Sequence, residues 1–134
     1  MRIRAVQLGS PRKRGEGIRI GTVRWLPRGV KKKDYAAEDY FDVWLPALAP
    51  SRNLLAWAKE RDIVENDEEW KRFAGRCERE LLKDTDCRQN LILLAETAKK
   101  TPISIGCYCE NESRCHRSIL LKLIKRAGTK AFQF

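Results

Sequence analysis

The side chains able to do chemistry crowd into one short stretch, residues 107–117. This stretch, the cysteine loop, reads Cys-Tyr-Cys-Glu-Asn-Glu-Ser-Arg-Cys-His-Arg and holds three of the five cysteines and the single histidine. A thiolate can attack an electrophile or bind a soft metal ion, and an imidazole can exchange a proton near neutral pH. The candidate site residues of this loop are Cys107, Cys109, Glu110, Cys115, His116 and Arg117.

A thiol- or histidine-dependent active site is the first interpretation of the cysteine loop. Cys115 would be the nucleophile, His116 the base, and Glu110 a group that orients His116 or acts as a base itself. A helix is expected to begin near Cys115, and the partial positive charge at its N-terminus would lower the pKa of this thiol. The loop lacks the Cys-x5-Arg phosphatase signature, because only four residues separate Cys109 from Arg114.

A metal site is the second interpretation. The loop offers thiolate and imidazole ligands, which suit zinc or iron, from Cys107, Cys109, Cys115 and His116. Within a strand, Cys107 and Cys109 would share one face, whereas the adjacent Cys115 and His116 are hard to direct at one ion. This interpretation requires zinc or iron as a cofactor, while the catalytic one requires none.

A structural role is the third interpretation. Free cysteines are among the most buried residue types, so Cys107 would pack in the core. Glu110 and Arg117 would then form an ion pair, and His116 would satisfy backbone groups near the helix start. The sequence leaves the three interpretations open, and with them the question of whether the protein is an enzyme.

The net positive charge is confined to the basic segment, residues 1–33. This segment carries eleven Lys and Arg side chains and one acid, whereas residues 34–134 carry seventeen of each sign, so the net charge of +10 lies at the N-terminus. Such a block predicts a polyanionic partner, either a nucleic acid or a phosphorylated small molecule. The candidate anion-binding residues are Arg24, Arg28 and Arg117. The alternative is a non-enzymatic nucleic-acid-binding module that uses this segment, with the cysteine loop supporting the fold.

Hydrophobic periodicity predicts the elements that position these residues. Alternation of polar and apolar residues predicts strands at 2–8 and 18–26, and an apolar run predicts a buried strand at 102–108. Apolar stripes predict helices at 50–61, from Asp67, from a cap at Asp86, and from Cys115 to Arg126. This order predicts one compact α/β domain over residues 1–134, with a small, mostly parallel sheet covered by four to five helices.

Two further groups of side chains are expected to pack in the core. Cys77 and Cys87 fall on apolar helix stripes and would act as small buried hydrophobes. The aromatic residues of 35–49 would form a short helix or loop packed on the core, in preference to a platform for stacking bases.

The predicted fold places the cysteine loop where open α/β sheets bind ligands. Ligands of such sheets bind beyond the carboxyl ends of the strands, and the loop follows the predicted strand at 102–108. If the strand at 18–26 lies beside it and runs parallel, Arg24 and Arg28 would end near the loop and define an anion pocket.

The chain shows no sign of a membrane protein. No apolar run approaches the roughly 20 residues of a membrane helix, and the N-terminus lacks the apolar stretch of a secretory signal. We therefore expect a cytoplasmic protein without a membrane partner, whose oligomeric state the sequence leaves open.

Several motifs in order resemble one known family. They are Trp-Leu-Pro-Arg-Gly-Val at 25–30, Trp-Leu-Pro-Ala-Leu-Ala-Pro-Ser at 44–51, Glu-Trp-Lys-Arg-Phe at 69–73, and Cys115-His116-Arg117 with Cys107 and Glu110 upstream. Over roughly residues 1–126 the chain is similar to the DUF488 family, particularly its YeaO-like branch. The resemblance implies a compact α/β domain but no established activity. It carries over the positions Arg24, Arg28, Cys107, Glu110, Cys115, His116 and Arg117. The chain departs from the family in having Cys109 between Cys107 and Glu110, and Cys77 where tyrosine is common.

Overall fold

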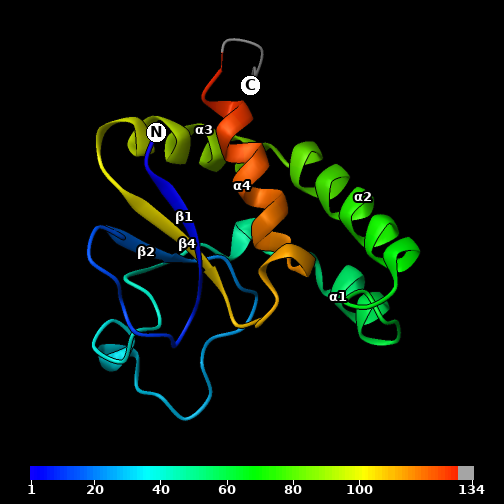
Figure 1. Ribbon diagram of the computed structural model, residues 1–134, viewed down its shortest axis with the longest axis horizontal. Helices are drawn as coiled ribbons and strands as arrows, with labels where there is room; N and C mark the ends of the chain where they lie inside the picture. Colours follow the sequence, from blue (N-terminus) through cyan, green and yellow to red (C-terminus); the bar gives the residue numbers. More distant parts are fainter. Residues whose placement is uncertain (130–134) are drawn as a thin grey trace.

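Four strands and four α-helices make up residues 1–129, the part of the chain that the computed structural model describes (Figure 1). The strands are β1 (Ile3–Gln7), β2 (Ile18–Gly21), β3 (Val43–Trp44) and β4 (Ile103–Cys107). The helices are α1 (Arg52–Lys59), α2 (Asp67–Lys83), α3 (Thr85–Lys100) and α4 (His116–Ala127). Short 3-10 turns lie at Lys32–Asp34, Pro46–Leu48 and Glu112–Arg114. The expected α/β class is confirmed, and residues 130–134 of the expected domain lie outside the described part.

The strands form one all-parallel sheet in the order β1-β4-β2-β3. Ile103 of β4 pairs with Ile3 of β1 on one side and with Ile18 of β2 on the other. The condition stated for an anion pocket, a strand in 18–26 that runs parallel beside the strand in 102–108, is therefore met. Because the strands are parallel, the segments that follow β1, β4 and β2 all leave the same edge of the sheet.

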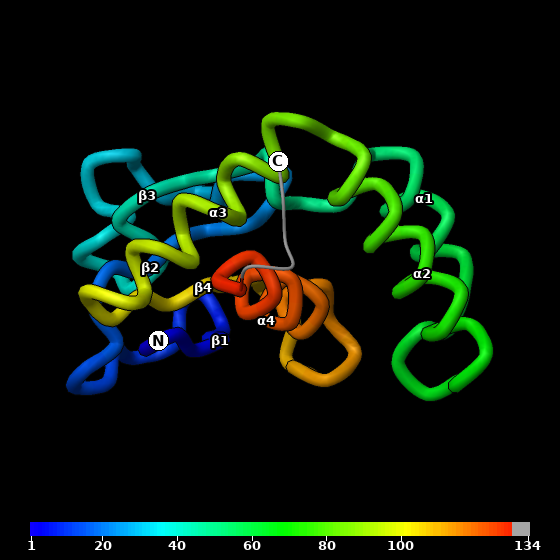
Figure 2. Tube along the Cα trace, turned by 90° about the horizontal axis from the view of Figure 1, so that it is seen from above, coloured from blue at the N-terminus to red at the C-terminus, as the bar shows by residue number. Residues whose placement is uncertain are grey.

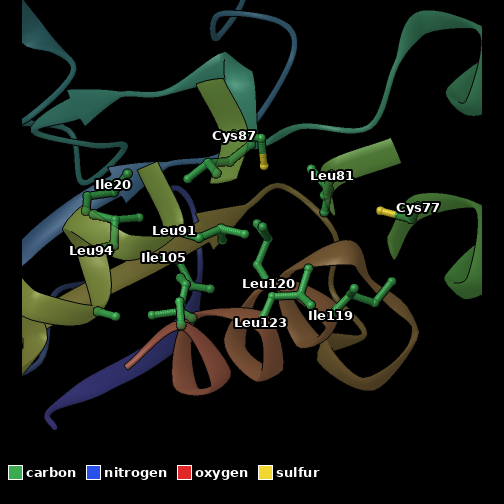
Figure 3. Packing of buried hydrophobic residues seen from close by; sticks show 14 of the residues in the cluster. Ile20, Cys77, Leu81, Cys87, Leu91, Leu94, Ile105, Ile119, Leu120 and Leu123 are labelled. Atoms are coloured by element: carbon green, nitrogen blue, oxygen red, sulfur yellow. The ribbon is translucent and has the colours of Figure 1, made fainter. Parts of the chain in front are cut away.

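Helices α3 and α4 cover one face of this sheet, while α1 and α2 lie to one side of it (Figures 1 and 2). Apolar side chains from the sheet and from both helices meet in the main core, among them Ile20, Ile105, Leu91, Leu94, Leu120 and Leu123 (Figure 3). Cys77 of α2 and Cys87 of α3 are buried in the same cluster (Figure 3). Their expected role as small buried hydrophobes matches this packing. Within residues 1–129, no helix is both long and apolar enough to cross a bilayer.

Irregular chain covers the opposite face of the sheet. This loop layer, residues 8–17 and 22–42, contributes the buried Leu8, Val23, Tyr35 and Phe41 to a second core cluster. Two of the strand residues that face it are glycines: a Cβ atom on Gly21 would lie 2.4 Å from the Phe41 ring, and one on Gly106 would lie 2.3 Å from Leu8. Both faces of the sheet are thus buried, as is usual for parallel sheets. The aromatic residues Tyr35 and Phe41 pack on the core as expected.

A buried ion pair ties the basic segment to the sheet. Arg19 of β2 is fully buried and lies 2.8 Å from the carboxylate of Glu16, the one acid of residues 1–33. The Arg19 guanidinium also donates to the carbonyl oxygens of Ser10 and Asp39. Burial alone would raise the pKa of Glu16, but hydrogen bonds from the Lys13 amide and from Arg19 outweigh it and lower that pKa. The middle of the basic segment is therefore fixed against the fold.

Two element boundaries and one short strand differ from the sequence predictions. The second strand ends at Gly21, well short of residue 26, where Thr22 turns to bond the Gly106 carbonyl and His116. The two residues of β3 are both exposed and carry no alternating pattern, so the sequence did not predict this strand. Helix α3 begins at Thr85, since Asp84 rather than Asp86 is the cap and accepts from the Asp86 amide.

Candidate functional site

The cysteine loop joins the central strand of the sheet to the helix that packs on it (Figure 1). Cys107 is the last residue of β4, and Cys115 is the N-cap residue of α4. Between them the Asn111 side chain accepts from the Arg114 amide and caps a single 3-10 turn. The loop therefore folds back on itself and brings its two ends together at the carboxyl edge of the sheet.

Three sulfur atoms meet at this edge. The Sγ atoms of Cys107, Cys109 and Cys115 all lie within 4.8 Å of one another, and those of Cys107 and Cys109 are 3.7 Å apart. Cys107 and Cys115 are buried, whereas Cys109 is exposed. For a tetrahedral zinc ion with Zn–S bonds of about 2.3 Å, two sulfur ligands lie about 3.8 Å apart. The spacing of the cluster is thus compatible with a metal ion, and His116 does not join this mutual group.

The three thiols differ widely in pKa, so that one of them carries a negative charge. Hydrogen bonds from the thiols of Cys107 and Cys115 lower the pKa of Cys109 to about 2. The same contact with Cys109 raises the pKa of Cys107 to about 11. The pKa of Cys115 is raised as well, because its thiol is hydrogen-bonded to Cys107 and Cys109 and is buried. Cys109 is therefore the anionic sulfur, and the expected lowering at Cys115 does not occur.

His116 is held in one tautomer by the end of β2. Its Nε2 lies 2.7 Å from the carbonyl oxygen of Thr22, which can only accept, so Nε2 carries the proton. The Thr22 hydroxyl donates to Gly106 O at 2.8 Å and so turns a lone pair toward the same Nε2. Burial lowers the pKa of His116 and keeps the ring neutral. The free Nδ1 then lies 3.7 Å from the Sγ of Cys115.

Arg117 is buried and its side chain bonds the backbone of the cysteine loop. The side chain is 2% exposed, and its Nη2 donates to the carbonyl oxygen of Cys109 at 2.7 Å and to that of Glu110 at 3.4 Å. Its Nε has no acceptor among residues 1–129. The expected ion pair between Glu110 and Arg117 is not formed within the described chain. Arg117 donates to the backbone carbonyl oxygen of Glu110, and Glu110 is exposed. Glu110 is likewise not hydrogen-bonded to His116, whose partner is Thr22.

The three cysteines and His116 open into a cavity of about 170 Å³. Its wall is mostly apolar and includes Trp25 as well as the cations Arg24 and Arg114. Arg24 is fixed there by donating to the carbonyl oxygens of Ala49 and Pro50 at 3.2 and 3.1 Å. Arg28 lines a neighbouring hollow with Tyr108 and does not reach the cavity wall. Of the expected anion-binding residues, only Arg24 therefore lines the same cavity as the cysteines.

Sequence reasoning missed three residues of this site. Thr22 fixes His116, Arg114 lines the cavity, and Trp25 forms part of its wall. Thr22 follows β2 at the edge that carries the site, so a polar residue just after a strand parallel to β4 was an available signal. Trp25 and Arg114 gave no comparable signal, because their positions depend on how separate segments pack.

The fold and the site define a small α/β protein with a cysteine–histidine cluster at the carboxyl edge of a parallel sheet. The family model described as "Active DUF488-N3 subclade" matches residues 3–128, and the chain belongs to the DUF488 family. This match confirms the family resemblance, while the YeaO-like branch stays a prediction. No curated protein and no solved structure matches the chain.

Proposed function

We propose that the cysteine loop is a thiol-dependent reaction centre that acts on an anionic substrate. The observation that carries this proposal is the convergence of three sulfurs and the free Nδ1 of His116 on one small cavity. A nucleophile, a base within reach of a thiol proton, and a third group that orients the base are the usual parts of a nucleophilic site. Cations in the cavity wall favour a substrate that carries negative charge.

Each cysteine has its own role in this proposal. Cys109 is exposed and anionic, so its sulfur attacks the electrophilic atom of the substrate, and the leaving group departs with the bonding electron pair. Cys115 gives its proton to that leaving group. A water molecule then displaces the Cys109 sulfur as a thiolate, and the water proton returns through His116 Nδ1 to Cys115. The nucleophilic role expected for Cys115 passes to Cys109, because Cys115 is 2% exposed.

Two further observations support the proposal. The matching subclade is described as active, which favours a chemical function over a purely structural one. Arg24 places a positive charge in the cavity wall, beside Arg114, whose guanidinium is paired with Asp67. Arg117, beneath the loop, acts as a positioning residue that fixes the Cys109 carbonyl and so the direction of its side chain.

A metal centre is the second candidate function, favoured by the 3.7 Å separation of Cys107 and Cys109 Sγ. Cys107, Cys109 and Cys115 would hold zinc or iron, and the fourth position would remain for water or substrate. An ion bound there would neutralise the thiolate and remove Cys109 as a free nucleophile.

The experiment that separates the two candidates is elemental analysis of the tag-free protein together with a count of its reactive thiols. The reaction-centre proposal expects no bound metal and one thiol, Cys109, that iodoacetamide labels rapidly and that the Cys109→Ser variant lacks. About one zinc or iron per chain, with three thiols protected until a chelator is added, would establish the metal centre instead.

A further inference from the structure

Trp25 stands at the junction of three hollows. Its side chain is 56% exposed, although large aromatic residues are seldom left in solvent without a partner. It lines the cysteine cavity, a hollow of about 610 Å³ beside Arg28 and Tyr108, and another of about 520 Å³ beside Arg52. The two outer hollows form the Trp25 groove, whose aromatic and charged residues are Trp25, Arg28, Tyr40, Arg52, Lys59 and Tyr108.

The groove and the cavity are lined by cations without carboxylates. The cations in the three walls are Arg24, Arg28, Arg52, Lys59 and Arg114, and no Asp or Glu lines any of them. Arg24 and Arg28 belong to the basic segment, but Arg52, Lys59 and Arg114 come from residues 34–134, which contain as many acids as bases. Acids do line a separate hollow, which holds Glu80 and Asp84 and shares Arg24 with the cysteine cavity. The positive charge along the groove therefore matches a chain of phosphates.

The aromatic side chains of the groove present ring faces and edges at fixed positions. The Tyr108 hydroxyl donates to the Trp25 carbonyl oxygen at 2.9 Å, and the rings of Tyr40 and Tyr108 meet edge to face with centroids 6.4 Å apart. The guanidinium of Arg52 lies 4.8 Å from the centre of the Trp25 ring. Aromatic rings interleaved with cations form the usual platform for single-stranded nucleic acid, in which bases stack and phosphates pair with Lys and Arg.

We propose that the Trp25 groove binds single-stranded nucleic acid, with an unpaired base stacked on Trp25 and the flanking phosphates on Arg28, Arg52 and Lys59. A duplex hides the faces of its bases, whereas a single strand offers them to an exposed indole. The spread of cations over two outer hollows suits several successive phosphates better than one small phosphorylated molecule. The proposal rests on the proposed function in one respect: the nucleotide on Trp25 is the substrate presented to the cysteine cavity.

The test is fluorescence anisotropy of a labelled oligothymidine strand titrated with the full chain. The strand should bind more tightly than a duplex of equal length and than a free mononucleotide. Replacement of Trp25 by leucine should weaken binding about tenfold, in line with the loss of one stacked base. Each of Arg28→Gln, Arg52→Gln and Lys59→Gln should lower the slope of log affinity against log salt by about 0.7.

Two control variants test whether losing any exposed charge or any exposed apolar side chain weakens strand binding. Lys122→Gln removes an exposed charge outside the groove, and Leu93→Ala removes an exposed apolar side chain. Both variants should bind the strand as wild type does. Because Trp25 is largely exposed, circular dichroism should show that Trp25→Leu remains folded, and Trp25→Phe should retain most of the affinity through its own ring.

Three outcomes would overturn the proposal. They are unchanged affinity of Trp25→Leu, equal affinity for duplex and strand, or equal affinity for a mononucleotide. If Trp25→Leu bound the strand as tightly as wild type, and if heparin displaced the strand equally well from both proteins, the basic segment would bind polyanions without contacting bases. Strand binding is measured without any thiol reaction, so a Cys109→Ser protein should still bind. Normal binding combined with an unreactive Cys109 would contradict the proposed function and leave the groove assignment standing.

Discussion

At the scale of single residues, the site depends on which sulfur holds the negative charge. Two thiols donate toward Cys109, and the unprotonated Nδ1 of a neutral His116 lies 3.7 Å from Cys115 Sγ. The sequence placed all three cysteines in one loop, but it did not show which of them donates and which accepts. The pKa of each thiol depends on distances of a few ångströms that only the folded loop defines. For this reason the sequence brought the three cysteines together but assigned the lowered pKa to Cys115, whereas the structure assigns it to Cys109.

Cys109 should react with iodoacetamide at nearly the same rate at about pH 5 and at about pH 8. Its pKa is lowered to about 2, so the thiolate is present throughout this range, whereas an ordinary thiol loses reactivity about tenfold per pH unit below its pKa. Peptide mass spectrometry after timed labelling would measure the rate. Cys77 and Cys87 serve as internal controls, since burial raises the pKa of each to about 12. A tenfold fall in the Cys109 rate for each pH unit would contradict the assignment.

At the scale of elements, the helices could be predicted and the loop layer could not. The apolar positions Phe73, Cys77 and Leu81 of α2 repeat at helical spacing, and all three are buried. The segment 22–26 continues an alternating pattern, yet it leaves the sheet because Thr22 turns to bond the Gly106 carbonyl and His116. Local periodicity predicts elements whose own pattern is buried against one face. It does not predict where irregular chain must cross a sheet, since that depends on contacts between distant segments.

The buried thiols of α2 and α3 should make the protein sensitive to alkali. The pKa of Cys77 and of Cys87 rises from an ordinary 9.0 to about 12, because burial disfavours the thiolate. Their contribution to stability is complete below the unfolded pKa and is lost as the pH rises toward the folded pKa. Urea unfolding should therefore show a fall in the free energy of unfolding from about pH 9 to about pH 11. The Cys77→Ala/Cys87→Ala variant should show a shallower fall, and an identical fall would contradict this explanation.

Gly17→Ala should be far more destabilising than Gly29→Ala, although the two glycines have nearly equal φ angles of +72° and +73°. A Cβ on Gly17 would lie 1.8 Å from the Pro102 carbonyl oxygen, whereas nothing lies within 4 Å of one on Gly29. The backbone angle alone should cost about 1–2 kcal/mol at both positions. The added clash should bring the loss for Gly17→Ala to about 3 kcal/mol or more. Equal losses in urea unfolding would show that the loop moves away from Pro102 without cost.

At the scale of the whole molecule, the fold is a sheet held between a helical layer and a layer of loops. The helical layer is held by the main apolar core, whereas the loop layer combines a smaller apolar cluster with polar contacts such as those of the fully buried Arg19. The charge of residues 1–33 gave no hint that Glu16 and Arg19 would pair inside the protein. An acid surrounded by eleven cations in the sequence could equally well be solvated, and only the tertiary structure shows that it is buried.

Glu16→Gln should lower the free energy of unfolding by about 3 kcal/mol, because it leaves the guanidinium of Arg19 buried without its counter-charge. Glu68→Gln is the matched control, since Glu68 pairs with Lys71 while its side chain is 80% exposed, and it should change stability by less than about 1 kcal/mol. The lowered pKa of Glu16 means that its contribution is present above the unfolded pKa and is lost as the pH falls through the folded one. Urea unfolding at neutral pH would test the pair. Similar losses in the two variants would show that the buried pair contributes no more than the exposed one.

The position of Trp25 also gives the protein a built-in optical probe. The indole lines the cysteine cavity and both outer hollows, so a molecule entering any of them changes the surroundings of one fluorophore. The chain has three other tryptophans, of which Trp44 donates to the Val23 carbonyl, while Trp57 and Trp70 pack against the main core. A variant with phenylalanine at these three positions would emit from Trp25 alone. Its emission spectrum would then report occupancy of the site during a search for substrates, without any label on the ligand.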